Sequence, residues 1–407
     1  MKRGVPIRSL VPLLLVAGAV GYAGGRDHWI GRVRDAFRPQ PEPVPQAVAT
    51  LPAPPFETRT IDDLHTFVDS LIVDAVEDAD LWRPLATETD PDQRERIRDR
   101  LHAQYARMLE LPERRPARIV QRTRWFARDG VTADLLRLET GPGMHLDAAL
   151  FMPDAPRTPQ SAILAIHGAE GDLPAMAEDL DYHHGFGFEL AREGHVVLAP
   201  HMVASDVAAH GRTLFVKGAV VGTHILALEL PQLMGAIDVL AETPGVDAAR
   251  IGVYGISRGA RHAMLLGALD PRVSAVVATG YFANRFEWLF QPDTTQSDTS
   301  TDLRRDIAPG QAMAYPPEMH LLLDDMNLVG LIQPRHLAIV IGREDSHLPS
   351  ATAEFERVRE VYAAAGTPER AVFLTVEGGH ETYAADVLPF LARWVADSPT
   401  PAREQMP

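Results

Sequence analysis

The 407-residue sequence contains no cysteine. This absence excludes a disulfide framework, a thiolate nucleophile, a cysteine zinc site and a lipidated N-terminal cysteine. Positive charge is also scarce, because 39 Lys and Arg residues stand against 55 Asp and Glu residues, and the formal net charge is −16. A chain this acidic lacks the basic surface that attracts nucleic acid or anionic lipid, so we expect neither as a partner.

Cofactor motifs are missing as well. The stretch "GRTLFVKG" (211–218) is not a phosphate-cradling loop of the Walker type, and no dinucleotide fingerprint follows the first strand. The histidines of "DYHHG" (181–185), with His201, His210 and His224, have neither the helical nor the short-loop spacing of zinc ligands. We therefore expect structural roles for these histidines, and neither a cofactor nor a metal.

The N-terminal segment is of a different kind. Residues 1–25 place three basic residues before the apolar run "LVPLLLVAGAVGYAGG", which is typical of an export signal. Gly21 and Ala23 offer a small-x-small cleavage pattern, so the segment is either a cleaved signal peptide or an uncleaved membrane anchor. Either way, the sequence predicts export to the cell envelope or periplasm, with membrane contact only through this segment.

Composition then divides the rest of the chain. Residues 26–59 include seven prolines between residues 39 and 55 and are expected to form an extended linker. Residues 60–117 show helical spacing in "IDDLHTFVDSLIVDAVEDA" and "RERIRDRLHAQYARMLEL", which predicts a helical extension of two helices. The last residues, 398–407, are expected to be a disordered tail.

Residues 118–397 are predicted to be the main domain. Three strand-like runs come first, and strands and helices then alternate along the chain, as in "SAILAIHG", "FGFELAREG" and "HVVLAP". Such alternation indicates an α/β fold with a mostly parallel central sheet and helices on both faces. Residues 281–335 interrupt it as an insert, which either covers the active site or decorates the surface.

One short stretch suggests a nucleophile. In "GVYGISRGAR" (252–261), Ser257 lies between Gly255 and Gly259, after a β-branched run and before apolar residues at helical spacing. A nucleophile elbow needs small residues at these two positions, because the sharp reversal brings the strand and helix backbones together. The context therefore predicts Ser257 as a nucleophile, and a plain strand-to-helix turn is the alternative.

A serine nucleophile needs a histidine base and a carboxylate that orients the base. After "LAIVIG" comes "REDSHLP", which offers Asp345 as the acid, with Glu344 as a rival acid and His347 as a rival base. After "AVFLTVEGG" comes His380. The order Ser257, Asp345, His380 is the chain order of α/β-hydrolase triads.

Five stretches carry a family resemblance: "ILAIHGAEG", "FELAREGHVVLAPH", "GVDAARIGVYGISRGA", "IQPRHLAIVIGREDSHLP" and "VEGGHE". With them the chain resembles the dienelactone-hydrolase and acetyl-xylan-esterase-like branch of the α/β-hydrolase superfamily, which is related to the prolyl oligopeptidases. The resemblance implies Ser257 as nucleophile, Asp345 as acid and His380 as base. His201 stands where the family often has an acidic residue, and Ala260 replaces a common glycine, so the subfamily stays open.

An oxyanion hole places hydrogen-bond donors about 3 Å from the developing oxygen. We expect one donor to be the backbone N–H of Arg258, directly after the nucleophile. The other is expected from the loop where His167 and Gly168 match the superfamily's His-Gly signature, with the Ala169 N–H preferred. The Arg258 guanidinium either lies near the reacting centre, as in the similar Ser-Arg pair of glucuronoyl esterases, or forms a surface salt bridge.

The sequence thus predicts a serine hydrolase that cleaves carboxylic esters through an acyl-enzyme, with a small-molecule or carbohydrate-linked ester as substrate. One alternative is a peptidase or amidase of the prolyl-oligopeptidase-related type, although residues 56–117 are too few for the propeller that those enzymes carry. The other alternative is a non-catalytic envelope protein that uses the fold for binding or as a scaffold. A complete triad argues against this last hypothesis.

Overall fold

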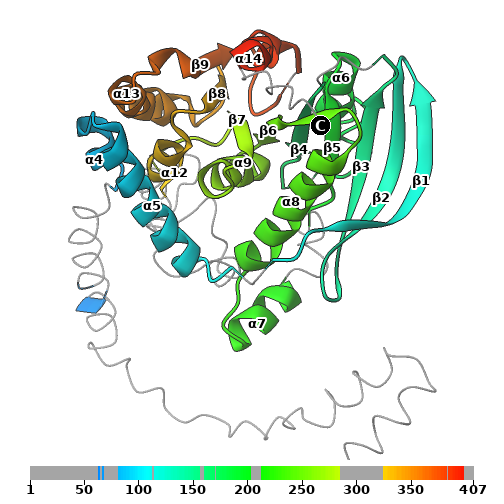
Figure 1. Cartoon of the computed structure of the whole chain (residues 1–407), viewed down its shortest axis with the longest axis horizontal. Helices are drawn as coiled ribbons and strands as arrows, with labels where there is room; N and C mark the ends of the chain where they lie inside the picture. Colours follow the sequence, from blue (N-terminus) through cyan, green and yellow to red (C-terminus); the bar gives the residue numbers. More distant parts are fainter. Residues whose placement is uncertain are drawn as a thin grey trace, which may run out of the picture. The chain divides into compact units, whose positions relative to one another are not determined.

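The strands expected between residues 117 and 379 all form, and they assemble into one nine-stranded sheet (Figure 1). The order across the sheet is β1-β2-β3-β5-β4-β6-β7-β8-β9. The strands are β1 (Arg118–Arg128), β2 (Val131–Gly141), β3 (Met144–Pro153), β4 (Gln160–Ile166), β5 (Val196–Pro200), β6 (Val246–Ile256), β7 (Val273–Thr279), β8 (His336–Gly342) and β9 (Ala371–Val376).

The computed structural model describes most of the chain from residue 81 onward. The described residues are 63, 64, 67, 81–111, 114–155, 160–169, 171–202, 212–284, 324–382 and 384–397. The predicted signal or anchor, the proline-rich linker, the tail and most of the predicted insert lie outside them. Within the described part of the chain, no helix combines the length and the apolar character that crossing a membrane requires.

The sheet is mostly parallel. From β5 through β9 in the sheet order, neighbouring strands pair in parallel, whereas β1, β2 and β3 form an antiparallel meander that joins at β5. Strands β4, β5 and β8 are buried along their whole length, as parallel strands covered by helices on both faces must be. The predicted α/β class is therefore confirmed.

A tight turn fixes the register of the meander. Arg128 of β1 pairs with Val131 of β2, and only Asp129 and Gly130 stand between them, with φ of 49° and 77°. Two consecutive positive φ values match the twist of the flanking strands and favour Asp-Gly at these positions. The turn therefore sets the register beside it, and shifts between Arg124 and Phe126 and between Ile119 and Gln121 change the pairing farther along β1.

Helices cover both faces of the sheet, and each face has its own apolar cluster. On one face, Phe186 and Leu190 share a cluster with Val387 and Trp394. On the other face, the larger cluster includes the apolar stripes of the remaining long helices. The first face is covered by α6 (Phe186–Arg192) and α14 (Ala384–Asp397), and the second by α8 (Ile225–Glu242), α9 (Arg258–Leu269) and α13 (Leu348–Ala364).

The described helices before the sheet pack into the same core. They are α4 (Arg83–Thr87) and α5 (Pro91–Met108). Asp90 caps α5 by accepting a hydrogen bond from the Gln93 N–H at 2.9 Å, and Leu101 and Tyr105 of α5 are buried in the larger cluster. The second predicted helix is thus present, and α5 ends at Met108, before the proline that was expected to stop it.

Besides the short α4, two further described helices were not predicted. One is α7 (Arg212–Val220). The other is α12 (Asp325–Ile332), which falls inside the predicted insert. Every residue of α12 is buried, and Leu328, Val329 and Ile332 belong to the core cluster beside α9. The last part of the predicted insert is therefore part of the core, and whether the rest covers Ser257 lies outside the described residues.

Candidate active site

Ser257 lies on a sharp turn between β6 and α9, as the sequence predicts. Its φ of 55° and ψ of −123° are a backbone conformation that residues with a side chain rarely adopt. A Cβ at Gly255 would collide with the Gly259 carbonyl, and a Cβ at Gly259 would collide with the carbonyls of Ile166 and His167. Glycine is therefore required at both positions, and the local geometry is that of a nucleophile elbow.

The elbow is tied to the end of the neighbouring strand. The Ser257 N–H donates to the Thr279 carbonyl at 2.8 Å. The next residue, Gly280, has a φ of 66°, and a Cβ there would lie 3.1 Å from His380 Nδ1 and 3.2 Å from Asp345 Oδ2. The β7 end thus brings Ser257, Asp345 and His380 into one neighbourhood, because only a glycine leaves room for the two loops to close over it.

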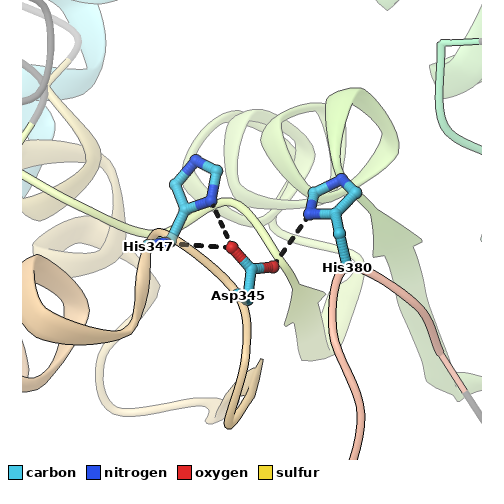
Figure 2. A group of neighbouring side chains, drawn as sticks. All are labelled: Asp345, His347 and His380. Carbon is cyan, nitrogen blue, oxygen red and sulfur yellow. Dashed lines mark hydrogen bonds and ion pairs between the residues drawn. The ribbon is translucent and has the colours of Figure 1, made fainter. Parts of the chain in front are cut away.

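Asp345 and His380 come from the two loops that follow β8 and β9. Asp345 Oδ2 accepts a hydrogen bond from His380 Nδ1 at 2.8 Å (Figure 2). The Asp345 side chain is almost fully buried, whereas 40% of the His380 side chain is exposed. Glu344, the rival acid, is exposed and contributes its backbone N–H to the Gly378 carbonyl at 3.0 Å. Asp345 is therefore the carboxylate that orients His380.

The rival base His347 bonds the same carboxylate from its other side. Asp345 Oδ1 accepts the His347 backbone N–H at 2.9 Å and the His347 Nδ1 hydrogen at 2.7 Å (Figure 2). Burial alone would raise the pKa of Asp345, but the hydrogen bonds from His347 and His380 outweigh burial and hold that pKa well below its usual range. Asp345 is therefore ionised at neutral pH and bound by two imidazoles.

The same three residues hold the one group of potential metal ligands found among the described residues. The ligand atoms of Asp345, His347 and His380 lie within 4.8 Å of one another. Both Nδ1 atoms point at a carboxylate oxygen at hydrogen-bond distance. That geometry is the one expected of a carboxylate that orients imidazoles, so the donor set matches an acid–base site as it stands.

The loop that carries His380 is anchored two residues later. The Thr382 N–H donates to the Tyr182 carbonyl at 3.1 Å, and the Thr382 hydroxyl bonds the hydroxyl of Tyr254, which lies on β6. The Tyr182 ring lies 6.0 Å from the His380 ring, between centroids. These contacts connect the His380 loop to the strand that leads into Ser257 and to the segment before α6.

The predicted oxyanion loop follows β4. His167 is buried; its Nε2 accepts the Met202 N–H at 3.1 Å, so its Nδ1 carries the hydrogen and donates to the Gly168 carbonyl at 2.7 Å. Burial lowers the pKa of His167 to about 4, and the nearby His183 and His201 add to the effect. The Gly168 N–H donates to His183 Nε2 at 2.8 Å. It is thus engaged within the protein, which leaves the Ala169 and Arg258 N–H groups as the predicted donors.

The Arg258 side chain has a buried partner. Its Nη2 donates to both carboxylate oxygens of Glu229, at 3.1 and 3.2 Å, and His262 Nε2 bonds the same carboxylate at 2.9 Å. Burial alone would raise the pKa of Glu229, but Arg258 and His262 lower it to about 2. The Arg258 side chain, 15% exposed, therefore forms an interior ion pair with α8 and not the surface salt bridge that was one of the two sequence interpretations.

A second serine–histidine pair lies at the opposite edge of the sheet. Ser161 Oγ bonds His195 Nδ1 at 2.7 Å, and both residues are buried. Ser161 lies near the start of β4 and His195 directly precedes β5, so the pair is at the amino ends of the parallel strands. Active sites of open α/β sheets form at the carboxyl ends, where Ser257, Asp345 and His380 lie.

The partners of His183 and Glu229 were not predicted from the sequence. His183 was expected to have a structural role, and its burial and hydrogen bonds agree with that role. The Asp-x-His spacing with Asp181 is a visible signal for the local carboxylate–imidazole turn. Glu229 lies inside an apolar helix run, and a buried carboxylate there indicates a cationic partner. The partner is Arg258, 29 residues away in sequence, so only the fold could identify it.

Comparisons with known proteins give one family match and several similar structures. Residues 146–299 match the family model described as the dienelactone hydrolase family, and no curated protein matches the chain. A putative acetyl xylan esterase from Bacteroides fragilis is similar in structure, with a TM-score of 0.55 and 18% identity over 69% of this chain and 75% of that one.

Two further structures are similar. A methylesterase has a TM-score of 0.55 and 17% identity, covering 78% of this chain and 69% of its own. A glucuronoyl esterase from Solibacter usitatus has a TM-score of 0.53 and 17% identity, covering 74% of this chain and 92% of its own. The sheet order, the elbow after β6 and the similar structures agree on an α/β-hydrolase fold, and residues 146–299 match the model of the dienelactone hydrolase family.

Proposed function

We propose that this protein is a serine hydrolase that cleaves carboxylic esters, with Ser257 as nucleophile, His380 as base and Asp345 as acid. The observation that carries the proposal is the 2.8 Å bond between Asp345 Oδ2 and His380 Nδ1, next to a positive-φ serine elbow. The dienelactone hydrolase match supports the same chemistry.

In this proposal each group has one step. Because Asp345 accepts the Nδ1 hydrogen, the His380 ring is held in the tautomer whose Nε2 can take the proton from Ser257 Oγ. Oγ attacks the acyl carbon, and the backbone N–H groups of Arg258 and Ala169 bind the oxyanion. His380 then protonates the alcohol as it leaves, and the same histidine activates water to hydrolyse the acyl-enzyme.

We further propose that the substrate is a small-molecule or carbohydrate-linked ester. The acetyl xylan esterase and the glucuronoyl esterase that share the fold bear names that refer to carbohydrate esters, which supports this class. Export of the chain to the cell envelope, through residues 1–25, is part of the same proposal and is supported by the basic and apolar pattern of that segment. A reporter that is active only after export, fused to residues 1–56, tests the location.

Labelling with a fluorophosphonate probe tests the chemistry. The wild-type protein should be labelled at Ser257 and should hydrolyse short-chain or aromatic p-nitrophenyl esters, whereas Ser257→Ala should do neither while its circular dichroism stays unchanged. Undiminished labelling of Ser257→Ala would refute the nucleophile. A proline-containing peptide in the same panel serves as a contrast, and faster turnover of the peptide than of any ester would contradict the ester specificity.

A further inference from the structure

His183 is one of the most buried polar residues of the described chain, with no exposed surface. Its Nε2 accepts the Gly168 N–H at 2.8 Å, and its Nδ1 donates to Asp181 Oδ1 at 2.6 Å. We infer that His183 is a positioning residue that fixes the oxyanion loop for catalysis, with Asp181 holding its ring. This inference rests on the proposed function and adds a residue to it.

The hydrogen-bond pattern defines one tautomer. A backbone N–H can only donate, so His183 Nε2 must be an acceptor without a hydrogen, and the hydrogen lies on Nδ1 facing Asp181. The Asp181 carboxylate also accepts the His183 backbone N–H at 2.9 Å, which fixes both ends of the residue. Burial lowers the pKa of His183, in keeping with the neutral ring that this pattern requires.

The loop that His183 holds packs against the elbow and against the rings of His167 and His183. The carbonyls of Ile166 and His167 abut Gly259 of the elbow, so the loop begins directly beside the nucleophile. The rings of His167 and His183 stand nearly perpendicular at 6.2 Å, and a Cβ at Gly171 would collide with both. The buried His183 side chain thus holds the loop through the Gly168 N–H.

The contact with His183 helps to position the next N–H, that of the proposed donor Ala169. The Gly168 N–H belongs to the peptide plane before Gly168, which His183 holds, and the Ala169 N–H belongs to the following plane, whose Gly168 carbonyl is held by His167 Nδ1. Both planes are therefore fixed on either side of Gly168. If the Gly168 N–H loses its acceptor, the loop can rotate, and the Ala169 N–H moves relative to Ser257. Displacement of a catalytic group by about 1 Å can lower the rate about 100-fold, and loss of an oxyanion donor lowers kcat about 100- to 1000-fold.

Two isosteric variants separate the two halves of the His183 contact. In His183→Gln the amide oxygen takes the place of Nε2 and can accept the Gly168 N–H, while the Asp181 contact is lost. In His183→Asn the amide takes the place of Nδ1 and can donate to Asp181, while the Gly168 contact is lost. We expect His183→Asn to lower kcat about 10- to 100-fold with little change in KM, and His183→Gln to retain most of the activity.

A transition-state analogue gives an independent readout. A phenylboronic acid forms a tetrahedral adduct with Ser257, so its inhibition constant should rise in His183→Asn by about the same factor as kcat/KM falls. His195→Asn is the matched control, because His195 is also buried and bonds a side chain through Nδ1, but at the opposite edge of the sheet. It should leave kcat and boronate affinity near the wild-type values.

Two results would overturn the inference. One is an equal loss in His183→Gln and His183→Asn, and the other is a loss confined to KM in His183→Asn. If His183→Asn does not fold, ¹⁵N NMR of histidine-labelled wild-type protein decides instead, with the His183 signal identified by its absence in His183→Gln. A hydrogen on Nε2 at pH 7 would then refute the inference. Failure of the wild-type protein to hydrolyse esters or react with fluorophosphonate would instead refute the proposed function.

Discussion

Two Asp-x-His turns flank the candidate site, and they have nearly the same local geometry. In one, Asp345 Oδ1 accepts the backbone N–H and the Nδ1 hydrogen of His347, at 2.9 and 2.7 Å. In the other, Asp181 Oδ1 accepts the same two groups of His183, at 2.9 and 2.6 Å. The turns differ in which of the two residues, the aspartate or the histidine, binds a third group at the site.

In the first turn the carboxylate binds the third group, because Asp345 Oδ2 accepts a hydrogen bond from His380. In the second turn the imidazole binds the third group, because His183 Nε2 accepts the Gly168 N–H. The comparison shows that a carboxylate–imidazole pair has no fixed role. The role depends on which atom of the pair remains for a third partner, and on whether that partner must exchange a proton or stay in place.

The largest expected effect comes from exchanging the two carboxylates for amides. Asp345→Asn should lower kcat by about 10⁴, because an amide can present its NH₂ to His380 and favour the wrong tautomer. Asp181→Asn should lower kcat about 10-fold or less, because the amide oxygen can still accept the Nδ1 hydrogen of a ring that never gains a proton. Steady-state hydrolysis of a p-nitrophenyl ester measures both, and similar losses in the two variants would contradict the distinction.

The buried imidazoles of the oxyanion loop should also be visible in the pH dependence of stability. The pKa of folded His167 is about 4 and its ordinary value is 6.5, so the unfolded chain binds more protons between these values. The free energy of unfolding must therefore fall as the pH drops from about 6.5 to about 4, and His167 accounts for about 3 kcal/mol of this fall.

Urea unfolding at pH 7 and pH 4.5 measures this contribution. His167→Gln cannot titrate at this position, so its free energy of unfolding should decline less steeply than that of the wild-type protein. The pKa of His336 is also lowered to about 4, mainly by burial, and this contribution is common to both proteins. Identical declines in the two proteins would show that His167 is not held neutral.

A smaller effect is expected from a substitution of Gly280, which follows β7 and lies beside Asp345 Oδ2. In Gly280→Ala, the added methyl group would press on Asp345 Oδ2 and His380 Nδ1 from 3.2 and 3.1 Å, and the positive φ of 66° adds backbone strain. We expect kcat to fall about 10- to 100-fold. Gly366→Ala is the matched control, since Gly366 has a φ of 71° and no atom within 4 Å of an added Cβ. It should share the strain and keep kcat, and an equal loss of kcat in both would attribute the effect to strain.

The local elements of this site were predictable from the sequence, whereas the contacts between distant residues were not. Strands, helices and the elbow were predictable because they depend on local spacing, as with Gly255 and Gly259. Chain order predicted an acid in the loop after β8, and the burial of Asp345 with the exposure of Glu344 then distinguished the two candidates. The hydrogen bond from the Gly168 N–H to His183 was not predictable, because it joins residues 15 apart through a loop that follows no periodic pattern. The buried α12 was missed because its apolar run lies inside a stretch that otherwise resembles a loop.

The smallest expected effect concerns the other histidine of the first turn. His347 supports Asp345 through Nδ1 and its backbone N–H, so His347→Asn, whose amide can replace Nδ1, should lower kcat less than threefold. His347→Ala removes one of the hydrogen bonds that keep Asp345 ionised and oriented, and kcat should fall about 10-fold, since a hydrogen bond to a charged group contributes about 1.5 to 3 kcal/mol and Asp345 keeps its other partners. The comparison with His183 is sharpest here, because the same substitution to Asn should be harmless at His347 and damaging at His183. If His347→Asn instead lowers kcat as much as His183→Asn does, then His347 contributes through more than its Nδ1 contact, and the two turns are more alike in function than their third partners indicate.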